Sequence, residues 1–364
     1  MLGNGLGKIL EDMVQRHNRF VDLFSGSASV AWHVSQKYRV ETWAYDLQHY
    51  SACLAAAVIE RDHSVDNQQL WASWKKRATQ KVKKTCPLES SLVNVATVRK
   101  ARSWGSEFDT CSLINAYAGH YYSPTQITWI DALRASLPEN DTERKLALAA
   151  LIMAASKCAA SPGHTAQPFQ PTETALKYIR ISWQRDVCAD VEHSLDLLAP
   201  RFAKLVGRAG VMNANEAAKI LRPGDLAFID PPYSAVQYSR FYHVLQAVAL
   251  GTTSPVFGVG RYPVISERPA SLYSQKSTSL NAIQDLLSTL AERGASAIVT
   301  FPDHKCSNGI DANAIKQIAK KLFTTRSRRV ASTFSTLGGP ASSTTGPRLA
   351  RLPADEMILC LEPK

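Results

Sequence analysis

Short apolar runs alternate with helical segments near the start of the chain. Residues 20–24, FVDLF, form an apolar run that predicts a strand, and after the turn SGSAS the segment VAWHVSQKY has helical character. A second strand is expected at residues 40–46, VETWAYD, followed by an Ala-rich helix from Tyr50. This order of strand, turn, helix, strand and helix predicts the opening of an α/β doubly wound sheet.

The middle third of the chain has a different pattern. The segment from Trp71 to Thr110 contains nine Lys or Arg residues and three acids. Residues 143–159 form a long apolar helical pattern. A loop broken by Pro and Gly follows at residues 161–172. We therefore expect a mainly helical insertion at residues 71–200, inside a sheet domain made of residues 1–70 and 201–364.

Strand patterns return in the last third. Residues 209–215, 225–230 and 295–301 are expected to form strands, with a long loop at residues 251–279. The tail predicts two more strands around a loop rich in Gly, Ser, Thr and Pro. Eight basic residues and no acid lie between Asp311 and Asp355.

Composition adds a partner class. The 364 residues carry a formal net charge of +11, which favours a polyanion such as nucleic acid as partner. No Cys or His cluster has the spacing of a metal site, so we expect no metal. The first residues lack the apolar core of a signal peptide, and no run approaches the length of a membrane helix. We expect a cytoplasmic protein that associates with DNA and not with a membrane.

The segment DLAFIDPPY, which begins at Asp225, suggests a binding corner. Ligands of parallel sheets bind beyond the carboxyl ends of the strands, and Asp230 is placed at such an end. Pro231 and Pro232 fix their own φ angles and restrict the residue before them, so they hold acceptor oxygens stiffly. Tyr233 then supplies a flat face for stacking. The alternative is a turn in which the prolines only end the strand.

Rigid acceptors beside a stacking ring suit a planar base with an exocyclic NH₂ group. The lone pair of such an amine is delocalised into the ring, which makes it a poor nucleophile. Two acceptors that take its two N–H bonds free the lone pair for attack, so catalysis would come from positioning and from acceptors aimed at developing positive charge.

DPPY resembles the catalytic motif of S-adenosylmethionine-dependent DNA adenine-N6 methyltransferases. FVDLFSGSASV resembles their cofactor motif, AYD the acid that holds the cofactor ribose, and GNGLGKIL their N-terminal motif. YAGHYYSPTQITWIDALR and QYSRFYHVL are similar to segments of the restriction-modification type. The motif order resembles the Dam-like, or alpha, arrangement. The resemblance implies a Rossmann-like methyltransferase domain, with a mostly parallel seven-stranded sheet and helices on both faces, plus a helical target-recognition insertion.

The candidate residues fall into three groups. The catalytic candidates are Asp230, Pro231, Pro232 and Tyr233. The candidates for binding S-adenosylmethionine are Lys8, Asp22, Phe24, Gly26, Asp46, Asn213 and Asn215. The candidates for DNA contact are Lys75, Lys76, Arg77, Lys83, Lys84, Tyr238 and Arg240.

Several candidates have a plain structural alternative. Asp22 would cap the next helix, Phe24 would fill the core, and Gly26 would serve a tight turn. Lys8 would be solvated, and the two asparagines at 213 and 215 would stabilise a turn. His243 is expected to be a packed helix residue and not a base. We assign no catalytic role to residues 298–309, which depart from the pattern of the family.

The resemblance implies methylation of a flipped adenine in duplex DNA, with a restriction endonuclease or defence system as a possible partner. Methylation of cytosine N4 needs the same acceptors, and an RNA base is a further alternative. A protein that binds DNA on a catalytically silent methyltransferase scaffold is another class. A nicotinamide-dependent oxidoreductase is disfavoured because the G-x-G-x-x-G fingerprint is absent.

Overall fold

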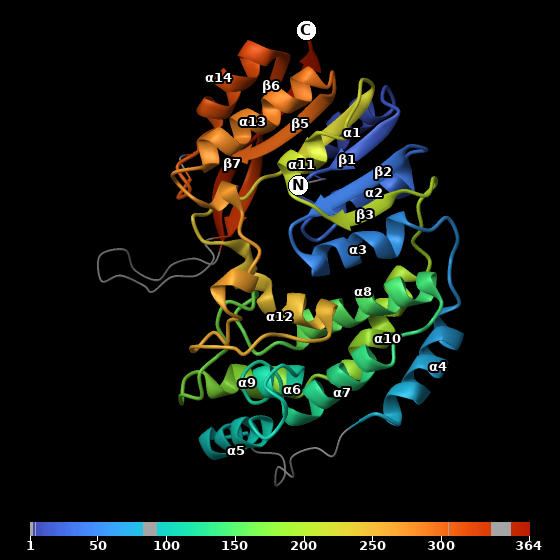
Figure 1. Cartoon of the computed structure of the whole chain (residues 1–364), viewed down its shortest axis with the longest axis vertical. Coiled ribbons are helices and arrows are strands. Elements are labelled where there is room, and N and C mark those ends of the chain that lie inside the picture. Colours follow the sequence, from blue (N-terminus) through green and yellow to red (C-terminus); the bar gives the residue numbers. More distant parts are fainter. Residues whose placement is uncertain (1–2, 4, 83–92, 305, 336–350) are drawn as a thin grey trace. The chain divides into compact units, whose positions relative to one another are not determined.

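The chain folds into two compact units. A computed structural model describes residues 3, 5–82, 93–304, 306–335 and 351–364 (Figure 1). The sheet unit comprises Met1–Leu47, Lys204–Tyr238 and Ala270–Lys364. The helical unit comprises Gln48–Ala203 and Ser239–Pro269.

A seven-stranded sheet organises the first unit. Its strands are β1 (Arg19–Asp22), β2 (Glu41–Asp46), β3 (Arg208–Val211), β4 (Asp225–Ile229), β5 (Ser296–Pro302), β6 (Phe323–Ser335) and β7 (Arg351–Pro363). Their spatial order is β3-β2-β1-β4-β5-β7-β6. The first five are parallel, and β7 runs antiparallel to both β5 and β6. The expected fold class, a mostly parallel seven-stranded α/β sheet, is confirmed.

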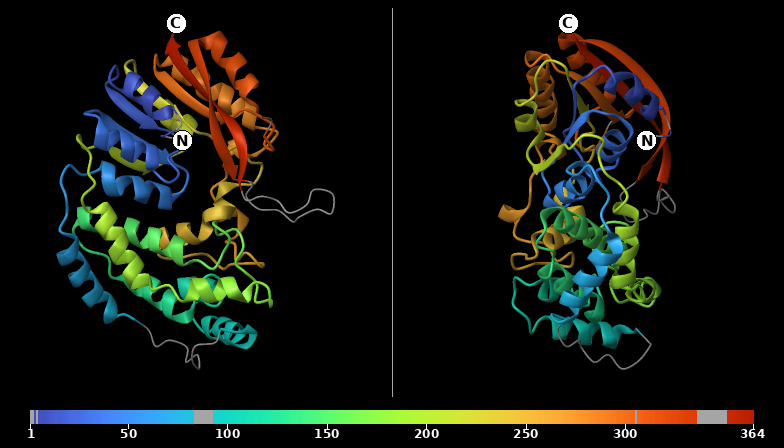
Figure 2. Two further views of the ribbon diagram at one scale, coloured as in Figure 1. Left: turned by 180° about the vertical axis from the view of Figure 1, so that it is seen from behind. Right: turned by 90° about the vertical axis from the view of Figure 1, so that its right-hand side faces the viewer.

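Helices cover both faces of this sheet (Figure 2). One face packs against α1 (Leu6–Val14) and α2 (Ser29–Lys37), and we call it the α1 face. The other packs against α11 (Ala214–Ala218), α13 (Ser279–Glu292) and α14 (Ala312–Leu322), and we call it the α13 face. Successive side chains of a strand point to opposite faces. In β1, β4, β5 and β7, the odd-numbered core residues lie on the α13 face and the even-numbered ones on the α1 face, and in β2 the odd-numbered Trp43 and Tyr45 lie on the α13 face.

The order of the strands places a switch point between β1 and β4. The chain moves outward from β1 through β2 to β3 and then returns to begin β4 on the other side of β1. In β1 and β4 every residue is buried, as expected for central parallel strands covered on both faces. A buried ion pair between Arg19 and Asp225 joins the starts of the two strands. Ligands of open α/β sheets bind at the carboxyl edge of such a switch point.

The helical unit contains α3 (His49–Ile59), α4 (Asn67–Thr79), α5 (Val95–Gly105), α6 (Leu113–Tyr117), α7 (Pro124–Ala135), α8 (Asp141–Cys158), α9 (Leu176–Trp183) and α10 (Val187–Leu198). Most of α12 (Tyr238–Leu250) belongs to it, with the short 3₁₀ helix η2 (Ile265–Glu267). A second 3₁₀ helix, η3 (Leu272–Ser274), belongs to the sheet unit. Local signals begin several helices. Ser123 and Gln126 form a capping box at α7 with Pro124 in the first turn, and Asp66 caps α4.

The helical unit has wider bounds than the insertion expected at residues 71–200. Helix α3 packs against α8, and the buried Arg61 just after α3 donates to the carbonyls of Leu198 (2.6 Å) and Ala199 (3.0 Å). Residues 239–269 join it through bonds such as Tyr121 to the Gly260 carbonyl at 2.9 Å. These contacts join segments far apart in sequence, so local patterning did not predict them. Across the described residues, no helix is both long and apolar enough to cross a membrane.

Candidate active site

Carboxylates gather at the switch point of the sheet unit. Asp22 is the last residue of β1, Asp46 is the last of β2, and Asp230 directly follows β4. All three are even-numbered, so strand alternation directs them to the α1 face. The three acids lie far apart in the sequence, and the sheet order brings them to neighbouring positions at one edge.

The turn after β1 is held against β2. Gly26 has a positive φ of 49°, and its N–H donates to the Asp46 carboxylate at 3.0 Å. The Ser25 N–H donates to the Tyr45 carbonyl at 3.0 Å. Ala28 also has a positive φ, 61°, which is unusual for a residue with a side chain. Helix α2 begins after Ala28 without a side-chain cap, so the alternative role of Asp22 as a helix cap is wrong.

Asp22 is a buried carboxyl that holds its proton to a high pH. Its side chain is 1% exposed, and burial raises the pKa of its carboxyl from 3.8 to about 8. A hydrogen bond from the Phe24 N–H (3.2 Å) opposes this rise, whereas the charges of Asp230 and Asp46 add to it. A cation placed beside this carboxyl would favour its ionised form.

The carboxyl of Asp230 and the two proline carbonyls give the DPP corner, residues 230–232, four acceptor oxygens, and two of them accept hydrogen bonds from other side chains. Thr300 donates its hydroxyl to Asp230 Oδ1 at 3.0 Å, and the Asn308 amide donates to the Pro232 carbonyl at 2.8 Å. Among the described residues, no donor reaches Asp230 Oδ2 or the Pro231 carbonyl. Burial, followed by the charge of Glu356, raises the Asp230 pKa to about 7, and the Thr300 hydrogen bond opposes this. The corner therefore retains two acceptors, as an NH₂ group requires.

The segment at residues 298–309 supports this corner, although the sequence analysis assigned it no catalytic role. Asn308 is fully buried and donates to the Tyr273 carbonyl at 2.9 Å as well as to Pro232. The Ser307 hydroxyl accepts from the Ala235 N–H at 3.0 Å. These contacts make the segment a positioning element. The only sequence signal was the Asn–Gly pair at 308–309, which by itself predicts just a turn.

Aromatic rings lie beside the corner. Tyr233 is partly buried against the core of the α13 face and meets Tyr238 edge-on, with ring centroids 6.4 Å apart. The rings of Phe24 and the buried Tyr273 meet edge-on, with centroids 5.0 Å apart. Phe24 also packs against the same core, which agrees with the core role expected for it. Tyr233 therefore follows the corner directly and packs against one neighbouring ring, that of Tyr238.

The remaining cofactor candidates are placed differently. Lys8 is exposed in the first turn of α1. Asn213 caps α11 by accepting from the Asn215 N–H at 2.9 Å. The Asn215 side chain donates to the Ala282 carbonyl at 3.0 Å and accepts from the Tyr273 hydroxyl at 2.6 Å. Both asparagines therefore have the turn role left open by the sequence, and Asn215 would have to break these bonds to reach a ligand.

The candidates for DNA contact in the helical unit are largely exposed. Lys75, Lys76 and Arg77 are exposed on α4, whereas the interleaved Trp71 and Trp74 are buried. Lys83 and Lys84 lie outside the described residues. Arg240 is exposed and its guanidinium carbon lies 4.8 Å from the centre of the Tyr262 ring. His243 is buried among aromatic rings, and burial lowers its pKa to about 4, as fits a packed residue.

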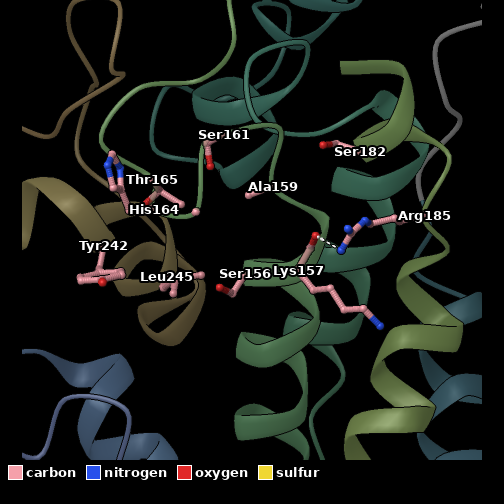
Figure 3. A pocket seen from close by; sticks show the side chains of 11 residues that line it. Ser156, Lys157, Ala159, Ser161, His164, Thr165, Ser182, Arg185, Tyr242 and Leu245 are labelled. Carbon is pink, nitrogen blue, oxygen red and sulfur yellow. Dashed lines mark hydrogen bonds between the residues drawn. The ribbon is translucent and has the colours of Figure 1, made fainter. Parts of the chain in front are cut away.

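A polar cavity of about 210 Å³ lies in the helical unit (Figure 3). Its walls come from the end of α8, the loop at residues 161–165, the residues after α9, and α12. Arg185 donates to the Lys157 carbonyl at 2.6 Å, and Lys157 pairs with Asp190. Helix α12 kinks at Tyr242, where Thr165 donates to the Phe241 carbonyl. The kink and the loop together shape the cavity.

Part of the chain is similar to known DNA methyltransferases. Residues 4–88 match the model of the D12 class N6 adenine-specific DNA methyltransferase family. The modification methylase LlaI of Lactococcus lactis subsp. lactis is 41% identical over 63 residues, 17% of this chain and 10% of that protein. The type II methyltransferase M.FokI of Planomicrobium okeanokoites is 38% identical over 65 residues, 18% of this chain and 10% of that protein.

The family match confirms the resemblance to adenine-N6 methyltransferases over residues 4–88. This range includes Lys8, Asp22, Gly26 and Asp46 and ends well before Asp230. The alignments span 10% of the length of both curated relatives. The DPP corner lies outside the matched residues, and its geometry alone supports a catalytic role for it.

Proposed function

We propose that the protein is a site-specific DNA methyltransferase that transfers a methyl group from S-adenosylmethionine to the N6 amino group of adenine. The observation that carries this proposal is the pair of acceptors at the corner, Asp230 Oδ2 and the Pro231 carbonyl. They match the two N–H bonds of an exocyclic amine, and Tyr233 offers a stacking face beside them. The family match over residues 4–88 supports the same chemistry.

The residues at the switch point fit the cofactor. S-adenosylmethionine carries a positive α-amino group and a sulfonium, and when bound it supplies the methyl group. Asp22 would hold the α-amino group, and Asp46 would accept from the ribose hydroxyls. The Gly26 turn leaves room for close approach, because a Cβ there would have its nearest contact at 3.9 Å. Burial favours the protonated, neutral form of Asp22 when no cation is bound. A cationic ligand would favour the ionised form by its charge, so such a ligand suits this site.

We propose the helical unit as the target-recognition part. A base inside a duplex does not reach the corner, so the target adenine would be flipped out of the helix. Exposed Lys75, Lys76 and Arg77 would neutralise phosphates. In the polar cavity, Arg185 uses one N–H on the Lys157 carbonyl and retains other donors for a backbone phosphate.

The test is a product assay on unmethylated genomic DNA with labelled S-adenosylmethionine, followed by digestion and mass separation of the nucleosides. We expect N6-methyladenine from the wild type and a rate at least about a hundredfold lower from Asp230→Asn, which loses a charged acceptor. The exposed Asp285→Asn serves as the matched control. N4-methylcytosine would keep the mechanism and change the base. If no methylated base forms in DNA or RNA, the proposal fails.

The relatives are named as modification enzymes, so we also propose a cognate endonuclease or defence system as partner. Mapping the methylated sequence would test this. A cognate nuclease should no longer cleave DNA at that sequence after methylation, and continued cleavage would contradict the partnership.

A further inference from the structure

Two arginines of the helical unit lie beside one tyrosine ring. The guanidinium carbon of Arg240, on α12, lies 4.8 Å from the centre of the Tyr262 ring, and that of Arg268, just after η2, lies 5.1 Å from the same centre. The two charges therefore lie within about 10 Å of each other, which is about one Debye length at 0.1 M salt, so salt screens their repulsion only in part. We call Arg240 and Arg268 the arginine pair.

The Tyr262 ring is held in place by other parts of the helical unit. Its hydroxyl donates to the Ala166 carbonyl at 2.5 Å. Its backbone N–H donates to the Phe257 carbonyl at 3.0 Å, and its own carbonyl accepts from the Phe257 N–H at 2.8 Å. The buried His243 ring packs beside it, with ring centroids 4.9 Å apart. These contacts position the ring independently of the arginine pair, so anchoring the ring does not by itself explain why two cations are placed there.

The arginine pair keeps most of its hydrogen-bond donors. Arg268 donates Nε to the Pro263 carbonyl at 2.7 Å, and Arg240 donates Nη2 to a hydroxyl, that of Tyr262, at 3.3 Å. A guanidinium has five N–H groups, so each arginine retains several. Arg240 is exposed, Arg268 is partly exposed, and neither has a carboxylate partner among the described residues. Two neighbouring cations with donors to spare suit an anion whose oxygens accept several hydrogen bonds.

We propose that the arginine pair clamps one backbone phosphate of the substrate DNA, an inference that rests on the proposed methyltransferase function. Guanidinium groups bind phosphate oxygens through parallel N–H···O bonds, and a phosphate bound by both arginines offsets the repulsion between them. Arg240 follows Tyr233 by seven residues, a stretch of chain that spans at most about 25 Å. This is less than one turn of duplex DNA, about 34 Å, so DNA that places its adenine at the corner can also reach the pair.

Binding of the full chain to a labelled duplex of about 30 base pairs, measured by fluorescence anisotropy between about 50 and about 200 mM salt, tests the proposal. We expect Arg240→Gln and Arg268→Gln each to weaken binding at least about fivefold, because each removes charge-assisted hydrogen bonds. The double variant should lower the slope of log affinity against log salt by about one, the value for one phosphate. Arg144→Gln is the matched control, because Arg144 likewise donates Nε to a proline carbonyl, that of Pro138, at 2.8 Å.

Arg268→Lys keeps the charge and should keep the salt slope of the wild type, whereas Arg144→Gln should match the wild type in both slope and affinity. An unchanged slope in the double variant would overturn the proposal, and so would a fall of about two, which would mean separate phosphates. If calorimetry shows that inorganic phosphate binds the wild type but not the double variant while their DNA slopes agree, the pair holds a free anion and the assignment to DNA is wrong. Failure of the proposed function looks different, because the wild type would then form no methylated base while its DNA binding could still be measured.

Discussion

The buried Asp22 carboxyl should make the folded protein less stable as the pH rises, and Asp22→Asn should remove this penalty. The folded protein holds this proton up to a pKa of about 8, whereas the unfolded chain releases it near 3.8. Between these values the unfolded state binds fewer protons, so the free energy of unfolding falls with rising pH. The amide of the Asp22→Asn variant keeps an oxygen that can accept from the Phe24 N–H, so the substitution removes the charge with little change of shape.

The magnitude follows from the shift of about four pKa units. At about 1.4 kcal/mol per unit, full ionisation of Asp22 costs up to about 6 kcal/mol of stability. Over the two units between about pH 5.5 and about pH 7.5, the expected change is about 3 kcal/mol. The side chain of the Asp22→Asn variant does not titrate, so the variant should gain stability relative to the wild type by up to that amount over this range.

Urea unfolding followed by circular dichroism at several pH values would measure the difference. Asp285→Asn is the matched control, because it removes an exposed carboxylate of the same unit. We expect the control to show no pH-dependent difference from the wild type. If the stability difference between Asp22→Asn and the wild type is constant over this pH range, Asp22 is not held in its protonated form and the reasoning is refuted.

Three further predictions follow from single contacts. Thr300→Val removes a donor that lowers the Asp230 pKa, so the acid limb of the rate–pH profile should move to higher pH; an unmoved limb would contradict this role. Asn308→Ala leaves one buried and one partly buried carbonyl without their donor and should lower the free energy of unfolding by about 2–4 kcal/mol in urea titrations, whereas a loss well below this range would show that the carbonyls find other partners. Arg185→Gln should reduce the salt slope of DNA binding by about one, and Arg180→Gln, which also bonds one backbone carbonyl, should not; equal slopes would remove the cavity from the DNA interface.

Local patterns were sufficient for the parts of the site that depend on near neighbours in the chain. Apolar runs predicted the central strands, and an acid at the end of a strand predicted Asp46 and Asp230. Asp22 was chosen from the family resemblance, because the expected strand ran on to residue 24. The glycine in the first turn predicted the positive φ of Gly26. The mostly parallel sheet followed from the alternation of strands and helices, and it is confirmed.

Contacts between distant segments were beyond these patterns. Thr300 and Asn308 reach the DPP corner across 70 and 76 residues, because β5 lies beside β4 in the sheet. Glu356 can raise the Asp230 pKa only because β7 inserts antiparallel between β5 and β6, two strands from β4. The bounds of the helical unit depend on the burial of Arg61 against carbonyls that lie more than a hundred residues away.

The sequence by itself determined which residue types stand at the ends of strands, since that depends on local periodicity and turn chemistry. Only the tertiary structure decided which oxygens at the corner are engaged and which are left for an amine. That outcome depends on strand order and register, which are set by the packing of the whole sheet.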